Sequence, residues 1–230
     1  MKAKIVLLGL AILLAGLSNL SAQWYIGGNV TVYGSNSDTK VENNSNTSEN
    51  KQSQLNLSPK IGYFVSDNFM VGLGLNIGSR KNESNYNSTS DYIYIDEYNS
   101  NYLSVEPFVR YYMPLSEKLS FINHFGLSYG FSNSYSSNYQ DNSGYKYYSE
   151  GKGNEIALGY APGISFNLTE KFLIELGIGS IGYSHSKSES TSKTENTDTG
   201  VVDEGDLQTT TSGDYYMVYN NVRLGLAFKF

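Results

Sequence analysis

The sequence contains no cysteine among its 230 residues. This absence excludes a disulfide framework, a thiol nucleophile and a cysteine-based metal site. An excess of positive charge is also missing, because 22 acidic residues stand against 16 basic ones, for a formal net charge of −6. An acidic surface is a poor partner for nucleic acid, so we do not expect nucleic-acid binding.

A hydrophobic run long enough to cross a membrane as a helix is absent as well. The run from Ile5 to Leu17 is shorter than the ~20 residues that a spanning helix needs. It follows Lys2 and Lys4 and precedes a stretch of mostly small and polar residues that ends at Ala22, which is the order of a secretory signal peptide. We therefore predict a signal peptide at residues 1–22 and a mature domain at residues 23–230.

What the chain does have is period-two patterning, most clearly in residues 215–230 (YYMVYNNVRLGLAFKF). The even positions from Tyr216 to Phe230 are mostly apolar, and most odd positions are polar or small. Such alternation is typical of a strand in a transmembrane β-barrel, and it places the even positions against lipid. The negative mean hydropathy argues against a helical membrane protein but not against a barrel, since only alternate strand residues meet lipid.

The same alternation recurs along the mature chain and predicts eight strands. Their ranges are Gln23–Gly34, Gln54–Val65, Phe69–Arg80, Ser100–Met113, Leu119–Phe131, Asn154–Asn167, Phe172–His185 and Tyr215–Phe230. Short turns near residues 67, 116 and 169 alternate with long polar loops at residues 35–53, 81–99, 132–153 and 186–213. Short turns on one rim and long loops on the other are how outer-membrane barrels are built.

The predicted fold class is therefore all-β, an eight-stranded antiparallel up-and-down transmembrane β-barrel with both termini on the short-turn side. The alternative is a soluble lipocalin-like barrel or sandwich with the apolar face inside. In that case the opposite faces, which hold glycine, serine and some charges, would have to form the soluble exterior.

The pattern resembles the small OmpA/OmpX-type barrels, and more broadly the outer-membrane β-barrel domain proteins of Gram-negative bacteria. The resemblance covers the whole mature chain and implies a protein of the bacterial outer membrane, in contact with lipid and lipopolysaccharide. A last strand that ends in phenylalanine resembles the signal read by the barrel-assembly machinery, which implies that role for Phe228 and Phe230.

Aromatic residues gather at the predicted strand ends, as the two interfacial girdles of a barrel require. One group lies near the short turns and the other near the long loops. The first consists of Tyr63, Phe69, Tyr111, Phe121, Phe166, Phe172, Phe228 and Phe230, and the second of Tyr33, Tyr129, Phe131, Tyr183 and Tyr216. The simpler interpretation is that tyrosine and phenylalanine are good strand formers.

Six ionisable residues fall on the predicted inward face: Lys60, Glu106, Arg110, His124, Glu175 and Arg223. A lysine or arginine facing lipid at mid-bilayer would cost roughly 2–4 kcal/mol, so alternation fixes these side chains inside. An eight-stranded barrel is just wide enough to be filled by side chains, and buried charges must be paired. We expect a structural plug in which Glu106 contacts Lys60 or Arg110 and Glu175 contacts Arg223. The alternative is a narrow gated ion path, in which Glu106→Ala or Arg223→Ala changes conductance.

Catalytic and cofactor signals are weak, and we predict no enzyme, no metal and no cofactor. Some eight-stranded outer-membrane proteins act on lipid A, and one deacylase family among them uses a histidine, a serine and an acidic residue on the lipid-facing side. In this chain His124 and Ser128 both fall on the inward face, and His185 falls at the start of a loop. The acidic run from Asp203 to Asp206 is either a solvated loop or a site for a divalent cation.

The long polar stretches are rich in Asn, Ser, Thr, Tyr and Gly, a composition that stays hydrated and makes adaptable contact surfaces. The leading hypothesis is a structural or adhesion-type barrel whose strands extend outward and present these stretches to an unknown extracellular partner. Residues 92–95, with two tyrosines and two isoleucines, suggest that the strands continue past the membrane. A narrow porin or small-solute transporter is the alternative, and a lipid-modifying enzyme is a third. Fold alone does not decide among these hypotheses.

Overall fold

The computed structural model describes residues 24–41, 44–88, 92–140, 144–218 and 223–229. In these ranges eleven strands form one antiparallel sheet. They are β1 (Trp24–Val41), β2 (Asn44–Ser66), β3 (Phe69–Ser88), β4 (Tyr92–Pro114), β5 (Leu119–Gln140), β6 (Tyr145–Asn167), β7 (Phe172–Gly177), β8 (Ser180–Asn196), β9 (Val202–Glu204), β10 (Gln208–Val218) and β11 (Arg223–Lys229). No helix within these ranges is long and apolar enough to span a bilayer. The predicted signal peptide lies outside the described residues.

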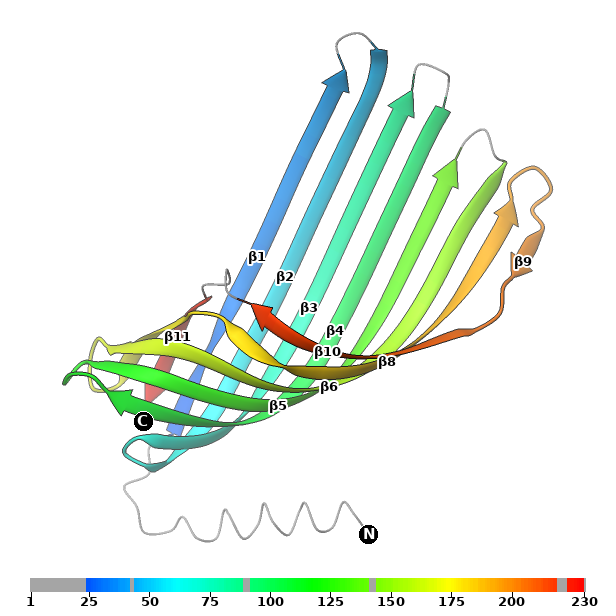
Figure 1. The fold of residues 1–230 in the computed structure, drawn as a ribbon. Helices are drawn as coiled ribbons and strands as arrows, with labels where there is room; N and C mark the ends of the chain where they lie inside the picture. Colours follow the sequence, from blue (N-terminus) through cyan, green and yellow to red (C-terminus); the bar gives the residue numbers. More distant parts are fainter. Residues whose placement is uncertain (1–23, 42–43, 89–91, 141–143, 219–222, 230) are drawn as a thin grey trace, which may run out of the picture.

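Within the described residues, the sheet closes into a ring of eight strands (Figure 1). β1 to β6 pair consecutively, and β6 also pairs both β7 and β8, which are two parts of the seventh strand. β10 and β11 are two parts of the eighth strand. β11 closes the ring by pairing β1 from Tyr25 to Gly28. The predicted eight-stranded up-and-down barrel is confirmed.

The lower part of the ring carries an apolar belt on its outer face. Because side chains alternate along a strand, every second residue points outward. Large apolar side chains left exposed there include Ile61, Leu73, Val109, Phe125, Leu158 and Leu226. Outward aromatic rings pack in pairs at both ends of the belt. Trp24 packs on Tyr63 near the short turns with ring centroids 5.3 Å apart, and Tyr183 packs on Tyr215 at the other end with centroids 5.1 Å apart.

The four polar stretches predicted as long loops are mostly strand. β1 continues to Val41, β2 begins at Asn44, β5 continues to Gln140 and β6 begins at Tyr145. Apart from the start of β4, these strands gave no signal in the sequence, because both of their faces are polar. Two polar faces remove the apolar period of two that marks a half-buried strand. We call this part of the sheet the extension; it comprises residues 34–41, 44–54, 79–88, 92–101, 132–140, 145–154, 185–196 and 208–213. In Figure 1 the long strands rise from the barrel as one curved sheet.

The alternation changes phase within the seventh strand. Gly163 pairs Gly177 and Tyr160 pairs Ile181, so three steps along β6 match four steps along the seventh strand. One extra residue forms a β-bulge at this point, where Gly179 has a φ of 135°. Because the side-chain period is two, the residues after the bulge face the opposite way. Leu176 is therefore exposed before the bulge and Ile181 after it.

The eighth strand shows the same change, which corrects the prediction for Tyr216. Leu224 and Leu226 are exposed at even positions of β11, but Met217 is exposed at an odd position of β10. The Tyr216 hydroxyl lies over Gly159 and Gly182, inside the barrel. The prediction failed because it carried one alternation through residues 215–230, whereas the eighth strand follows the bulged seventh strand. Phe230, predicted for the girdle, lies outside the described residues.

The core lies inside the barrel at the short-turn end. Its buried side chains come from seven strands: Tyr25, Phe64, Met70, Phe108, Tyr112, Ile122, Leu173 and Ala227. The Lys229 ammonium lies 4.8 Å from the ring centroid of Phe64 and covers this cluster. An apolar floor therefore fills the lumen below the charged residues.

Candidate functional site

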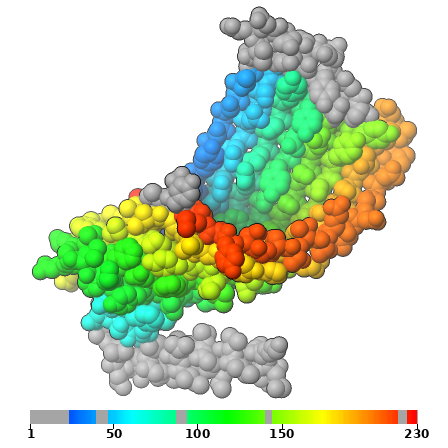
Figure 2. All heavy atoms as spheres, in the orientation of Figure 1, coloured from blue at the N-terminus to red at the C-terminus, as the bar shows by residue number. Residues whose placement is uncertain are grey.

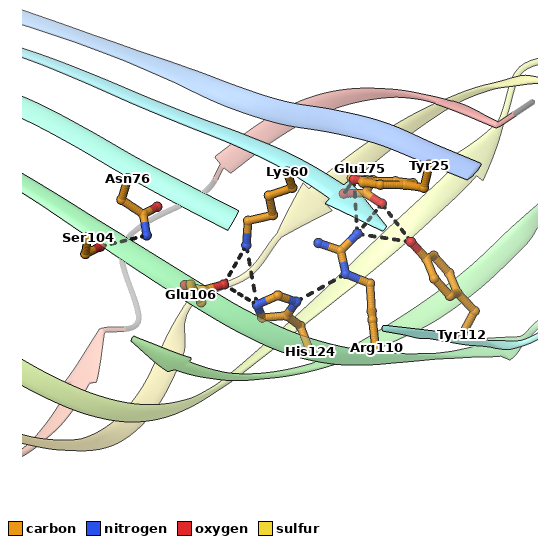
Figure 3. A network of polar contacts seen from close by, with 9 residues as sticks. All are labelled: Tyr25, Lys60, Asn76, Ser104, Glu106, Arg110, Tyr112, His124 and Glu175. Carbon is orange, nitrogen blue, oxygen red and sulfur yellow. Dashed lines mark hydrogen bonds and ion pairs between the residues drawn. The ribbon is translucent and has the colours of Figure 1, made fainter. Parts of the chain in front are cut away.

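The polar network of the lumen begins with three side chains from three strands. Lys60 on β2, Glu106 on β4 and His124 on β5 meet above the apolar floor (Figure 3). The Lys60 ammonium lies 3.0 Å from Glu106 Oε1, and His124 Nε2 lies 2.8 Å from the same oxygen. One carboxylate thus holds the lysine and the histidine together.

The contact between Arg110 and His124 fixes the state of the imidazole. Arg110 Nε donates to His124 Nδ1 over 3.2 Å. A guanidinium only donates, so Nδ1 must be an unprotonated acceptor and the ring is neutral, with its proton on Nε2. That proton is donated to Glu106. The Lys60 Nζ to His124 Nε2 approach of 3.3 Å then joins two donors and is not a hydrogen bond.

The second half of the network surrounds Glu175 on β7. Arg110 Nη1 lies 2.6 Å from Glu175 Oε1. The Tyr112 hydroxyl donates to the same oxygen over 3.1 Å, and the Tyr25 hydroxyl donates to Oε2 over 2.9 Å. Both carboxylate oxygens therefore have partners. A buried ion pair offsets the free-energy cost of its desolvation only when the remaining lone pairs of the carboxylate also accept hydrogen bonds.

Aromatic rings pack around the Arg110 guanidinium and exclude water from it. Its Cζ lies 5.3 Å from the ring centroids of both Tyr25 and Phe108, and the side chain is 5 % exposed. Phe108 also packs on His124, with ring centroids 4.9 Å apart. With His124 neutral, two cations and two carboxylates remain, so the network carries no net charge.

The structure brings together five of the six ionisable residues predicted for the lumen. Glu106 contacts Lys60, one of its two expected partners. Glu175 contacts Arg110. The expected contact of Glu175 with Arg223 is not tested, because the Arg223 side chain lies outside the described residues. The contact between Arg110 and Glu175 was not expected, because β4 and β7 are not neighbours in the sheet.

Tyr25 and Tyr112 are network members that the sequence reasoning missed. Both lie at inward positions, and Tyr112 follows Arg110 by two residues on the same face of β4. Tyr112 could have been predicted from this spacing, because a tyrosine two positions from a buried arginine lies on the same face of the strand. No comparable local signal marked Tyr25, which reaches Glu175 from β1.

Two small cavities border the network. One of about 110 Å³ lies between Tyr25, Arg110 and Glu175, and one of about 140 Å³ lies above Lys60 and Glu106. Sites for drug-sized ligands have volumes of roughly 300–1,000 Å³. These cavities suit water rather than a sizeable solute.

The arrangement does not present a nucleophile or a metal site. Ser128 lines the upper cavity with His124, but both imidazole nitrogens already contact other side chains. His185 is exposed on β8. Across the described ranges, no group of three or more His, Cys, Asp or Glu residues is placed to hold a metal. Glu204 of the acidic run lies 3.7 Å from Lys193 instead.

A closed ring of antiparallel strands, with an apolar outer belt and paired charges inside, defines an outer-membrane-type β-barrel. The family described as outer membrane protein beta-barrel domain matches residues 18–186 of this sequence. The chain belongs to this family and is an outer-membrane β-barrel protein. Comparison with curated proteins gave no match.

Solved structures of similar fold include three bacterial outer-membrane proteins. OprG from Pseudomonas aeruginosa is 15% identical, with 91% of this chain and 95% of that chain covered and a TM-score of 0.39. A major outer membrane protein from Thermus thermophilus is 15% identical, with 92% and 100% covered and a TM-score of 0.42. The outer membrane protease OmpT from Escherichia coli is 8% identical, with 93% and 100% covered and a TM-score of 0.48.

Proposed function

We propose that this protein is a surface-interaction barrel of the adhesion type, with a closed lumen and a rigid extension held outside the membrane. The belt lies against outer-membrane lipid and lipopolysaccharide, and the extension meets a partner outside the cell. During biogenesis the barrel-assembly machinery reads the last strand, in which Phe228 is exposed on the outer face.

The observation that carries this proposal is the continuity of the strands from the belt into the extension. β2 runs without interruption from Asn44 to Ser66, and β6 runs from Tyr145 to Asn167. Paired strands hold their side chains in fixed positions, whereas a hydrated loop of the same composition would have to be ordered at each encounter. A rigid sheet of this kind suits a contact surface.

The plugged lumen supports the same proposal over the alternative of a porin. The network joins β2, β4, β5 and β7 above an apolar floor, and the cavities beside it are small. An ion crossing this layer would have to separate Lys60 from Glu106 or Arg110 from Glu175. Separating a buried ion pair leaves uncompensated charges, which is strongly unfavourable.

A narrow porin remains the second candidate, because two cavities border the network. Two measurements on the refolded mature protein separate the two candidates. One is its conductance in planar bilayers, and the other is its gel mobility before and after boiling. A surface-interaction barrel is heat-modifiable and electrically silent. A steady open channel that changes in Glu106→Ala would favour the porin, and the absence of a heat-modifiable form would contradict the membrane barrel itself.

Attachment is the direct test of the surface role. Bacteria that display the protein are compared with bacteria that lack it for attachment to host cells and to each other. Equal attachment by both, with surface display of the protein verified by antibody, would contradict the proposal even if the barrel is electrically silent.

A further inference from the structure

The two faces of the extension differ sharply in charge. Cross-strand neighbours share a face, so the pairing register shows which side chains lie side by side. One outer row runs from Lys51 through Glu83, Glu97, Ser137 and Tyr148 to Lys193. Acids and bases are interspersed on this face, and some form ion pairs, such as Lys187 with Glu189 at 2.7 Å.

The inner face of the extension is almost free of charge. One inner row runs from Gln52 through Asn82, Tyr98, Ser136 and Ser149 to Ser192. The row two residues nearer the membrane carries Arg80. The row two residues farther out carries Asp96 and ends on β9 with Asp203, which pairs Thr194. The chain has 22 acidic residues, so a face with so few charges differs clearly from the rest of the surface.

This face is concave and broad. Figure 2 shows it hollowed between β1 and β10, with the strands of the extension forming its wall. From β2 to β8 it crosses five strand spacings, or roughly 24 Å at about 4.8 Å each. The charged network of the lumen closes its lower end. We call this surface the trough.

The chemistry of the trough selects for a ligand that is polar, uncharged and rich in hydroxyl groups. Serine, threonine, asparagine and glutamine side chains both donate and accept hydrogen bonds, as sugar hydroxyls do. Desolvating such groups costs far less than desolvating a charge. Tyrosine rings such as Tyr147, which is 47% exposed, offer flat amphipathic surfaces at low conformational-entropy cost.

We propose that the trough binds a neutral oligosaccharide chain presented outside the cell. This inference rests on the proposed surface role and names the ligand class. The breadth of the trough fits a chain of several sugar rings rather than a single sugar. A second copy of this chain does not fit, because two concave faces cannot stack on each other. An acidic glycan finds no basic cluster among the described residues of the inner face, where Asp96 and Asp203 outnumber Arg80.

The test uses the refolded mature protein and immobilised oligosaccharides of graded length, both neutral and acidic. We expect binding to neutral chains that strengthens with length. Adjacent residues of β5 give a matched pair of variants: Ser136→Asp places a carboxylate in the trough, and Ser137→Asp places one on the outer face. Ser136→Asp weakens binding by roughly tenfold or more because the new charge must be desolvated, whereas Ser137→Asp binds like the parent.

A second pair of variants removes aromatic rings from the two faces. Tyr98→Ala and Tyr147→Ala weaken binding, whereas the outer-face change Tyr135→Ala does not. Three results would overturn the inference: no binding to neutral glycans, binding of acidic glycans alone, or equal losses in Ser136→Asp and Ser137→Asp. If the protein binds no glycan but displaying bacteria still attach to cells, the surface role stands and the glycan proposal fails. Self-association abolished by Ser136→Asp, without glycan binding, would indicate a protein partner instead.

Discussion

Arg110 and Glu175 form an ion pair across the lumen, with 2.6 Å between Nη1 and Oε1. Their strands, β4 and β7, are not neighbours in the sheet. The pair therefore acts as a cross-brace between two walls of the barrel, and Tyr25 and Tyr112 complete its hydrogen bonds from β1 and β4. A brace of this kind links the stability of the barrel to the closure of its lumen.

Replacing Arg110 should destabilise the barrel strongly. Arg110→Ala leaves the partly buried Glu175 without its cation, and breaking a buried pair in this way costs roughly 3–5 kcal/mol. The exposed Arg80 of the extension provides the control, and Arg80→Ala should change the free energy of unfolding by about 0.5 kcal/mol or less. Urea unfolding in lipid vesicles measures both variants. Equal stability of the two would show that the brace contributes nothing.

Two glycines on β1 should respond differently to the same substitution. Gly28 has a φ of 151°, and a Cβ there would lie 2.5 Å from the Ser58 carbonyl oxygen. We expect Gly28→Ala to cost about 1–3 kcal/mol through backbone strain. A Cβ at Gly34 would meet nothing within 4 Å, so Gly34→Ala should have little effect. The midpoint of the heat-induced gel shift compares them, and similar midpoints would contradict the conformation assigned to Gly28.

The phase change of the eighth strand can be tested with spin labels. A label at Met217 should be accessible to a collision partner dissolved in lipid, and a label at Tyr216 to a water-soluble one. These expectations follow from the exposure of Met217 and from the position of Tyr216 over Gly159 and Gly182. The reverse pattern would mean that the eighth strand keeps a single alternation throughout.

Ion pairing on the outer face of the extension should appear in the titration of Glu83. The hydrogen bond and charge of Lys81 lower the pKa of this carboxyl from its ordinary value of 4.5. A lowered carboxyl pKa favours the folded state above pH 4.5, and this contribution is lost as the pH falls through the folded pKa. Because both groups are exposed, salt screens the interaction and the effect on stability is small.

NMR titration of Glu83 is the measurement for this prediction. Lys81→Gln should return the pKa of Glu83 toward the ordinary value, and high salt should do the same in the parent. Lys187→Gln, which removes the partner of Glu189 on β8, is the matched control and should leave Glu83 unchanged. If neither Lys81→Gln nor high salt changes the pKa of Glu83, the ion pair does not form in solution.

The sequence was informative wherever one face of a strand was apolar. Leu73 and Val109 marked the belt, and the same alternation turned Lys60, Glu106 and Glu175 inward. It could not pair Glu175 with Arg110, because contacts across a lumen depend on the curvature of the ring rather than on neighbouring strands. The sequence suggested that the strands extend outward, but it missed how far they extend, because a strand such as residues 44–54 has two polar faces. The bulge at Gly179 was missed because one extra residue leaves no mark in composition.

The short closing seam has a consequence for the order in which the chain folds. β1 pairs β2 from Trp24 to Val41, but within the described residues it pairs β11 only from Tyr25 to Gly28. Adjacent hairpins can form locally, whereas the seam joins the two segments farthest apart along the chain, and such long-range closure carries the largest entropic cost. We expect the wall to form first, hairpin by hairpin, as an open curved sheet. Closure then requires the last strand to dock on the first, so any chain that stops short of β11 stays an unclosed sheet.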